Sequence, residues 1–96
     1  MVKTEAFDAA RYLTSAEAQA ELLNDALASG NAVYVANAFG VIARARGMTD
    51  VAREAGVTRE ALYTALSEEG DPRLTTVLGV ARALGVTLSA RVNPPA

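Results

Sequence analysis

Residues 48–67 have the sequence MTDVAREAGVTREALYTALS, which predicts two short helices joined by a tight turn. Gly56 stands where such a turn requires a positive φ, which glycine adopts without a steric penalty. Ala52 provides a small side chain where the two helices would cross, and Thr58 is placed to cap the second helix. This combination is typical of a helix-turn-helix, with a bare helical hairpin as the alternative.

The apolar positions of this segment predict which face is buried. The side chains expected to pack against the rest of the domain are Val51, Ala55, Val57, Leu62 and Ala65. The second helix then turns its polar side chains toward solvent, and these are Thr58, Arg59, Glu60, Tyr63 and Thr64. In a helix-turn-helix, the outward face of the second helix enters the major groove of DNA.

The chemistry of that face suits DNA. Arg59 can donate two hydrogen bonds to guanine, and Glu60 can accept one from cytosine. Thr58 and Thr64 can bond to phosphates or bases, and the Tyr63 hydroxyl can bond to a phosphate. The free amides at the start of each helix, at Thr49 and Thr58, favour phosphate.

Three arginines are candidates for phosphate contacts: Arg44, Arg46 and Arg53. Each has an alternative role. Arg53 can pair with a nearby carboxylate, whereas Arg44 or Arg46 can bond to carbonyl groups at a helix C-terminus. Against tight DNA binding stand Asp50, Glu60 and a net charge of −2. We therefore expect useful affinity only from a dimer that reads two half-sites.

Start and stop signals extend the all-α prediction to most of the chain. Thr14 and Glu17 have the spacing of a capping box, and Asn31, Thr49 and Thr58 are further candidate caps. Glycines stand where the helices should end. The expected order is an arm or short helix over residues 1–13, a five-helix bundle over 14–85 and a strand over 86–92, all in a single domain of residues 1–96.

The tail alternates apolar and polar side chains, which is the period of a β-strand. Its apolar positions are Val86, Leu88, Ala90 and Val92. A lone strand leaves its backbone hydrogen bonds unmade, so we expect this one to pair across a dimer or with the sheet edge of a partner. A frayed tail before Asn93 is the alternative.

Composition narrows the function classes. The chain has no Cys and no His, which excludes disulfides and removes the commonest metal ligands and general base. We expect no enzyme activity and no cofactor. No apolar stretch is long enough to span a membrane, and the N-terminus lacks the features of a signal peptide, so a cytoplasmic location is expected. Residues 1–30 hold two basic and five acidic side chains, a net −3, which suits either a solvated face or a basic partner.

The chain resembles the HigA-like addiction-module antidote proteins, antitoxins with a lambda-repressor-like helix-turn-helix. The resemblance covers residues 7–88 and is carried by 7–13 (FDAARYL), 42–49 (IARARGMT), 51–63 (VAREAGVTREALY), Pro72, 76–78 (TVL) and 83–85 (ALG).

This resemblance implies a dual role. Such antitoxins neutralise a small basic RelE- or HigB-like toxin, and their homodimers repress their own operon at a palindromic operator in the promoter. It implies DNA contacts by Thr49, Thr58, Arg59, Tyr63 and Thr64. The chain departs from the family pattern at Asp50, where relatives often carry Gln, and at Thr64, where they often carry a basic residue. A stand-alone transcriptional regulator and a protein-interaction module without DNA binding are the alternative functions.

Overall fold

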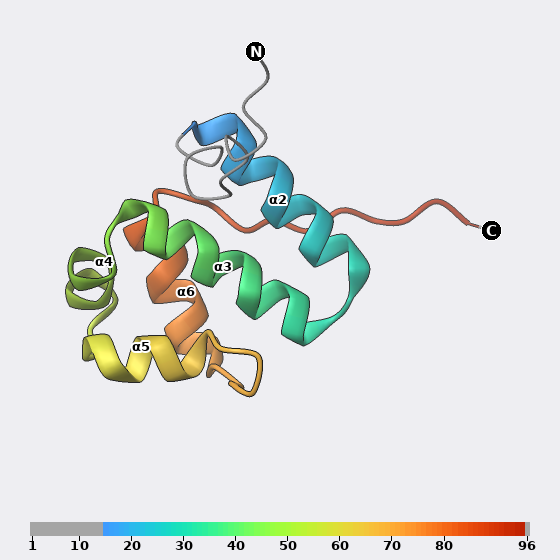
Figure 1. The fold of residues 1–96 in the computed structure, drawn as a ribbon. Helices are drawn as coiled ribbons and strands as arrows, with labels where there is room; N and C mark the ends of the chain where they lie inside the picture. Colours follow the sequence, from blue (N-terminus) through green and yellow to red (C-terminus); the bar gives the residue numbers. More distant parts are fainter. Residues whose placement is uncertain (1–14, 96) are drawn as a thin grey trace, which may run out of the picture.

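Five helices account for most of residues 15–95, the part of the chain that the computed structural model describes. They are α2 (Ala16–Ser29), α3 (Ala32–Arg46), α4 (Met48–Ala55), α5 (Arg59–Ala65) and α6 (Leu74–Ala83) (Figure 1). The predicted five-helix, all-α bundle is therefore confirmed. The arm or short helix expected over residues 1–13 lies outside the described residues.

α2 and α3 form an antiparallel hairpin. Ser15 caps α2, because its hydroxyl accepts a hydrogen bond from the backbone N–H of Ala18 at 3.1 Å. The predicted cap at Thr14 is wrong by one residue, since the backbone enters the helix after Ser15. Gly30 ends α2 with a φ of 69°, and the side chain of Asn31 caps α3, both as expected.

α4 begins two residues earlier than predicted, at Met48 and not at Asp50. Gly47, with a φ of 112°, separates α3 from α4, and α4 has no side-chain cap. The prediction that Thr49 caps this helix is therefore wrong, because Thr49 already lies in its first turn. The early start follows from packing: Met48 is only 5 % exposed and joins the core. The helix ends as predicted, at Gly56 with a φ of 80°.

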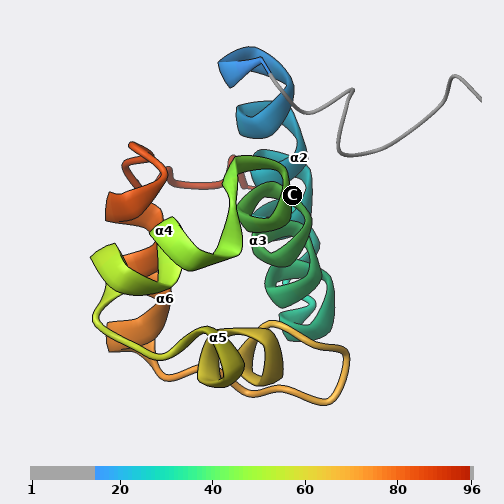
Figure 2. The ribbon, with the colours of Figure 1, turned by 60° about the vertical axis from the view of Figure 1, so that its left-hand side comes forward.

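α3 lies at the centre of the bundle. α2 covers one side of it, and α4, α5 and α6 lie on the other (Figure 2). The largest fully buried side chains come from four of the five helices and are Phe39, Leu23, Ile42, Leu62 and Val80. α4 packs most extensively on α6. There, a Cβ added to Gly79 would lie 3.2 Å from the carbonyl oxygen of Ala55, so only a very small residue allows this approach.

Arg46 joins three elements at the end of α3. Its guanidinium donates hydrogen bonds to the side-chain oxygen of Gln19 on α2, at 3.2 Å, and to the carbonyl oxygen of Leu84, at 2.8 Å. Leu84 is the C-cap of α6. A cation is well placed there, because the last carbonyls of a helix lack intrahelical partners and carry partial negative charge.

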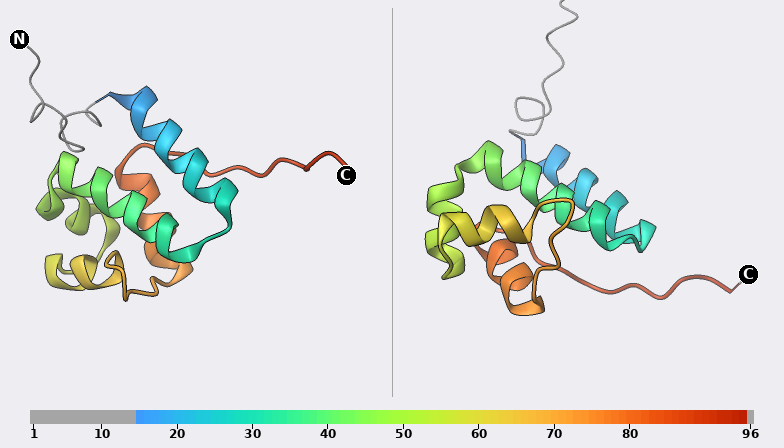
Figure 3. Two further views of the ribbon diagram at one scale, coloured as in Figure 1. Left: turned by 45° about the vertical axis from the view of Figure 1, so that its right-hand side comes forward. Right: turned by 60° about the horizontal axis from the view of Figure 1, so that its bottom comes forward.

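The strand predicted over residues 86–92 does not form in the single chain, where 86–95 have no regular secondary structure. A strand needs a second strand for its backbone hydrogen bonds, and residues 15–95 contain none. Val86 and Leu88 instead pack partly buried against the chain's own core. Beyond them the tail leaves the body of the bundle (Figure 3), and Val92 is 92 % exposed.

None of the helices in the described range has the length and hydropathy that a membrane span requires.

Candidate nucleic-acid interface

α5 presents a polar face that is held in place by one buried side chain. Leu62 is 0 % exposed and anchors the helix in the core. The Thr58 hydroxyl accepts a hydrogen bond from the N–H of Ala61 at 3.0 Å, which confirms Thr58 as the predicted cap. The five predicted outward-facing side chains are all exposed, namely Thr58, Arg59, Glu60, Tyr63 and Thr64.

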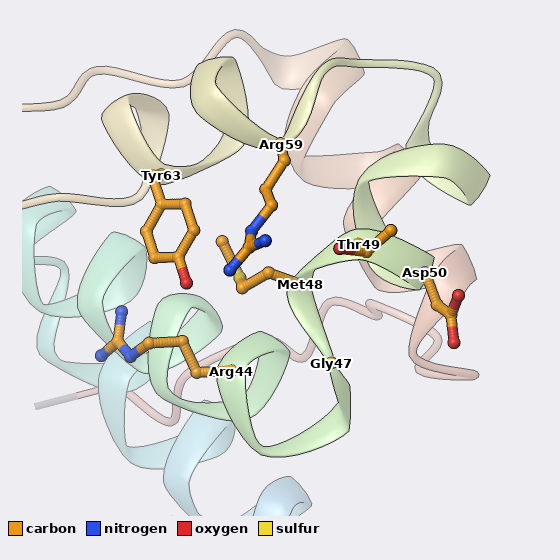
Figure 4. Close-up of a pocket in the computed structure, with 7 residues that line it drawn as sticks. All are labelled: Arg44, Gly47, Met48, Thr49, Asp50, Arg59 and Tyr63. Carbon is orange, nitrogen blue, oxygen red and sulfur yellow. The ribbon is translucent and has the colours of Figure 1, made fainter.

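The exposed side of α5 borders an open cavity of about 400 Å³ between three helices. α3 contributes Arg44, the start of α4 contributes Met48 and Thr49, and α5 contributes Arg59 and Tyr63 (Figure 4). We call this group of side chains the α5 face. The cavity thus brings together four residues that the sequence proposed as DNA contacts: Arg44, Thr49, Arg59 and Tyr63.

Arg59 lies over the aromatic ring of Tyr63, with its guanidinium carbon 5.5 Å from the ring centre. Contacts of this kind stabilise by about 0.5–1 kcal/mol at an exposed site and restrict the side chain. The neighbouring side chain of Tyr63, and to a lesser extent the carboxylate of Glu60, raises the pKa of Arg59 above its usual value. The α5 face therefore offers a permanently charged, partly oriented guanidinium.

Asp50 also lines the cavity, and its carboxylate is paired within α4. Its carboxylate accepts a hydrogen bond from Arg53 at 2.7 Å, one turn later on α4. Both side chains are 67 % exposed, so the pair adds little stability. In Figure 4 the carboxylate points away from Tyr63 and Arg44. The pair neutralises the acidic group that the sequence placed against DNA binding, and it matches the alternative role considered for Arg53.

The structure separates Arg46 from the other candidate phosphate contacts. Its guanidinium faces Gln19 and Leu84, on the side of α2 and the end of α6, and it does not line the α5-face cavity. Arg44, two residues earlier, does line that cavity and makes no hydrogen bond or ion pair within residues 15–95. Two arginines that look equivalent in the sequence thus occupy different environments.

Met48 is a lining residue that the sequence analysis did not propose. Its side chain closes the floor between α3 and α5, and Gly47 brings the start of α4 close to Arg44. The sequence does contain a signal for this position, because Met48 is an apolar residue directly after Gly47, the glycine that ends α3. Taken with the polar Thr49 and Asp50 that follow, it marks Met48 as the inward residue of the first turn of α4.

Within residues 15–95, no three acidic side chains gather closely enough to hold a metal ion. Cations, hydroxyls and an aromatic ring are instead the groups that bind phosphate and base edges.

A family model described as "Probable addiction module antidote protein" matches residues 3–92 of the chain. The chain belongs to this family. This family agrees with the resemblance seen in the sequence. The matched residues include both the α5 face and the first part of the tail. An uncharacterized protein of Haemophilus influenzae is 46 % identical over 80 residues, which cover 83 % of this chain and 82 % of that protein. No solved structure matches the chain.

Proposed function

We propose that this antidote-family protein is an antitoxin that neutralises a RelE- or HigB-like toxin and represses its own operon through the α5 face. Membership of the antidote family supports the antitoxin role and implies a toxin as partner. In this proposal the antidote-family protein acts by binding and has no catalytic activity of its own.

The arrangement of Arg59 supports the repressor role more than any other observation. Arg59 stands in the first turn of α5, exposed and stacked on Tyr63, with Arg44 across the cavity. In this role Arg59 reads guanine in the major groove, and Arg44 contacts the phosphate backbone beside it. Thr58, Thr64 and Thr49 add shorter contacts, and Glu60 accepts a hydrogen bond from cytosine.

A dimer is part of this proposal. The α5 face carries few uncompensated cations, because Arg53 is paired with Asp50 and Arg46 is hydrogen-bonded to Gln19 and Leu84 away from the cavity. A single copy therefore neutralises few phosphates, and affinity at physiological salt requires two copies on a palindromic operator.

The repressor role is tested by gel shift with the DNA upstream of the protein's own operon. Arg59→Ala should weaken specific binding by about 1–3 kcal/mol, which is roughly 5- to 150-fold, if Arg59 contacts a base bidentately. Arg59→Lys is the matched control: it keeps the charge but loses the planar fork. It should retain binding to unrelated DNA and lose preference for the operator. Wild-type protein that is folded yet shifts no upstream fragment at low salt would refute the repressor role.

The antitoxin role has a separate test. Co-expression with the product of the adjacent reading frame should yield a stable complex and relieve growth inhibition by that product. If that product is not toxic and does not co-purify, the antitoxin role is wrong whatever the DNA result.

A further inference from the structure

α6 has an apolar surface that residues 15–95 of the single chain leave uncovered. Leu74 is 70 % exposed and Leu78 is 46 % exposed, and the two are one helical turn apart on the same side of α6. This side continues into a groove of about 510 Å³, lined by Leu78, Ala81, Arg82 and residues 85–88. We call this surface, from Leu74 to the groove, the α6 groove. Leucines exposed in adjacent turns mark an interaction surface more clearly than isolated ones.

The tail of the same chain carries the complementary feature. It starts at the end of the α6 groove, where Val86 and Leu88 are fastened to the core. Residues 89–95 then project from the body with Ala90 and Val92 exposed (Figures 1 and 3). The tail is therefore divided in two. Val86 and Leu88 are partly buried against the core, whereas the alternating pattern continues through Ala90 and Val92, which are exposed.

We propose that two copies of the chain form a dimer by exchanging tails, with residues 89–95 of each copy lying in the α6 groove of the other. Val92 would then cover Leu78 in the groove, and Ala90 would cover Leu74. Each copy has one groove and one tail, so a twofold axis satisfies both and leaves none free for a third copy. This dimer serves the operator binding proposed above, but it is tested without DNA or toxin.

The lengths agree with this arrangement. α6 has 10 residues, which span about 15 Å at the rise of an α-helix. The seven residues of the tail, 89–95, extend to about 23 Å at roughly 3.3 Å per residue. The tail can therefore follow the whole α6 groove of a second copy and still allow for the distance to the axis. Pro94 and Pro95 favour an extended end and lower the entropy lost on docking.

The charges near the contact indicate an association driven by apolar burial. Arg82 lines the groove, Arg91 lies in the tail and Arg73 precedes α6, while Asp71 is the nearby acidic residue. Two identical copies therefore bring mostly like charges together. Raised salt screens this repulsion, so dimerisation should be maintained or strengthened in salt. DNA binding by the same protein should weaken under those conditions.

Disulfide trapping tests the exchange directly, because the natural chain has no cysteine. Leu78→Cys protein carrying an affinity tag is mixed with untagged Val92→Cys protein and mildly oxidised. We expect a mixed disulfide between the two chains, at least tenfold more abundant than with tagged Leu27→Cys in place of Leu78→Cys. Leu27 is a matched control, because it is 42 % exposed and lies on α2. Equal yields from the two pairs would overturn the proposal.

The double variant Leu78→Cys/Val92→Cys separates exchange from folding back. Exchange gives a covalent dimer on a non-reducing gel. A disulfide closed within one chain gives a monomer of altered mobility and overturns the proposal.

Sedimentation measures the dissociation constant of the dimer. Leu74→Ser should raise the dimer dissociation constant at least tenfold, and Leu27→Ser should leave it unchanged. A wild-type chain that stays monomeric at hundreds of micromolar would also overturn the proposal, whether or not it binds operator DNA or toxin.

Discussion

Replacement of Arg46 by methionine tests the structural role of this arginine against the DNA contact proposed for it from the sequence. Methionine keeps much of the length and apolar stem of the side chain but removes every donor. Two hydrogen bonds are lost, one to Gln19 at 3.2 Å and one to the carbonyl of Leu84 at 2.8 Å. Gln19 is 2 % exposed, so water cannot easily replace the donor on that side.

The expected cost follows from these contacts. A hydrogen bond with a charged partner contributes about 1.5–3 kcal/mol when it is shielded from water. Both of these bonds are only partly buried, because the Arg46 side chain itself is exposed. We therefore expect Arg46→Met to lower the free energy of unfolding by about 2 kcal/mol in total. For a domain of this size that corresponds to a fall in Tm of roughly 8–16 °C.

The measurement is urea and thermal unfolding followed by circular dichroism at 222 nm, with the operator gel shift run on the same protein. Arg44→Met is the matched control, since Arg44 is on the same helix and makes no hydrogen bond or ion pair within the described residues. The two variants should behave oppositely. Arg46→Met should lose stability and keep operator affinity per folded molecule, whereas Arg44→Met should keep stability and lose affinity.

Two results would refute this reasoning. If the free energy of unfolding of Arg46→Met lies within about 0.5 kcal/mol of the wild-type value, the bridge between α2, α3 and α6 does not hold the fold together. A protein of unchanged stability that has lost operator binding would restore Arg46 as a phosphate contact.

Three further predictions concern the scaffold. Thr58→Ala removes the cap on the N–H of Ala61 and should cost about 1 kcal/mol in urea unfolding, while Thr58→Ser should recover most of it. Leu62→Ala empties a site that is 0 % exposed and should cost about 2–5 kcal/mol; a loss below 1 kcal/mol would mean that α5 is not anchored there. Tyr34 donates a hydrogen bond to Asp25, which raises the pKa of Tyr34 above 10.0. Because the folded chain then holds this proton more tightly than the unfolded chain, the free energy of unfolding should fall as pH rises above about 10, and Tyr34→Phe should flatten that fall.

The helices were predictable because their signals are local. Capping side chains act within three residues, and a glycine that ends a helix does so through its own φ. Asn31, Gly30, Gly56 and Thr58 therefore behave as expected. The start of α4 was missed because Thr49 has the chemistry of a cap, but burial of Met48 moves the first turn two residues earlier.

The candidate site was predictable in part. The exposure of the polar side chains on α5 follows from the helical period, because burial of Leu62 leaves the opposite side of this helix in solvent. The pairing of Arg53 with Asp50 is local and was one of the alternatives, but the partners of Arg46 were not predictable, because they lie far away in the sequence. Arg46 bonds to residues 27 and 38 positions away. No periodicity within α3 distinguishes it from Arg44.

The sequence by itself determined the all-α class, most helix boundaries and the polar face of α5, because hydrophobic period, caps and glycines act over a few residues. Only the tertiary structure decided which arginines line the α5-face cavity. The crossing of α2, α3 and α6 turns Arg46 toward Gln19 and Leu84, whereas Arg44 on the same helix lines the cavity. The tail shows the same division. Its alternating pattern is a local property, but packing against the core divides it, with Val86 and Leu88 held and Val92 left exposed.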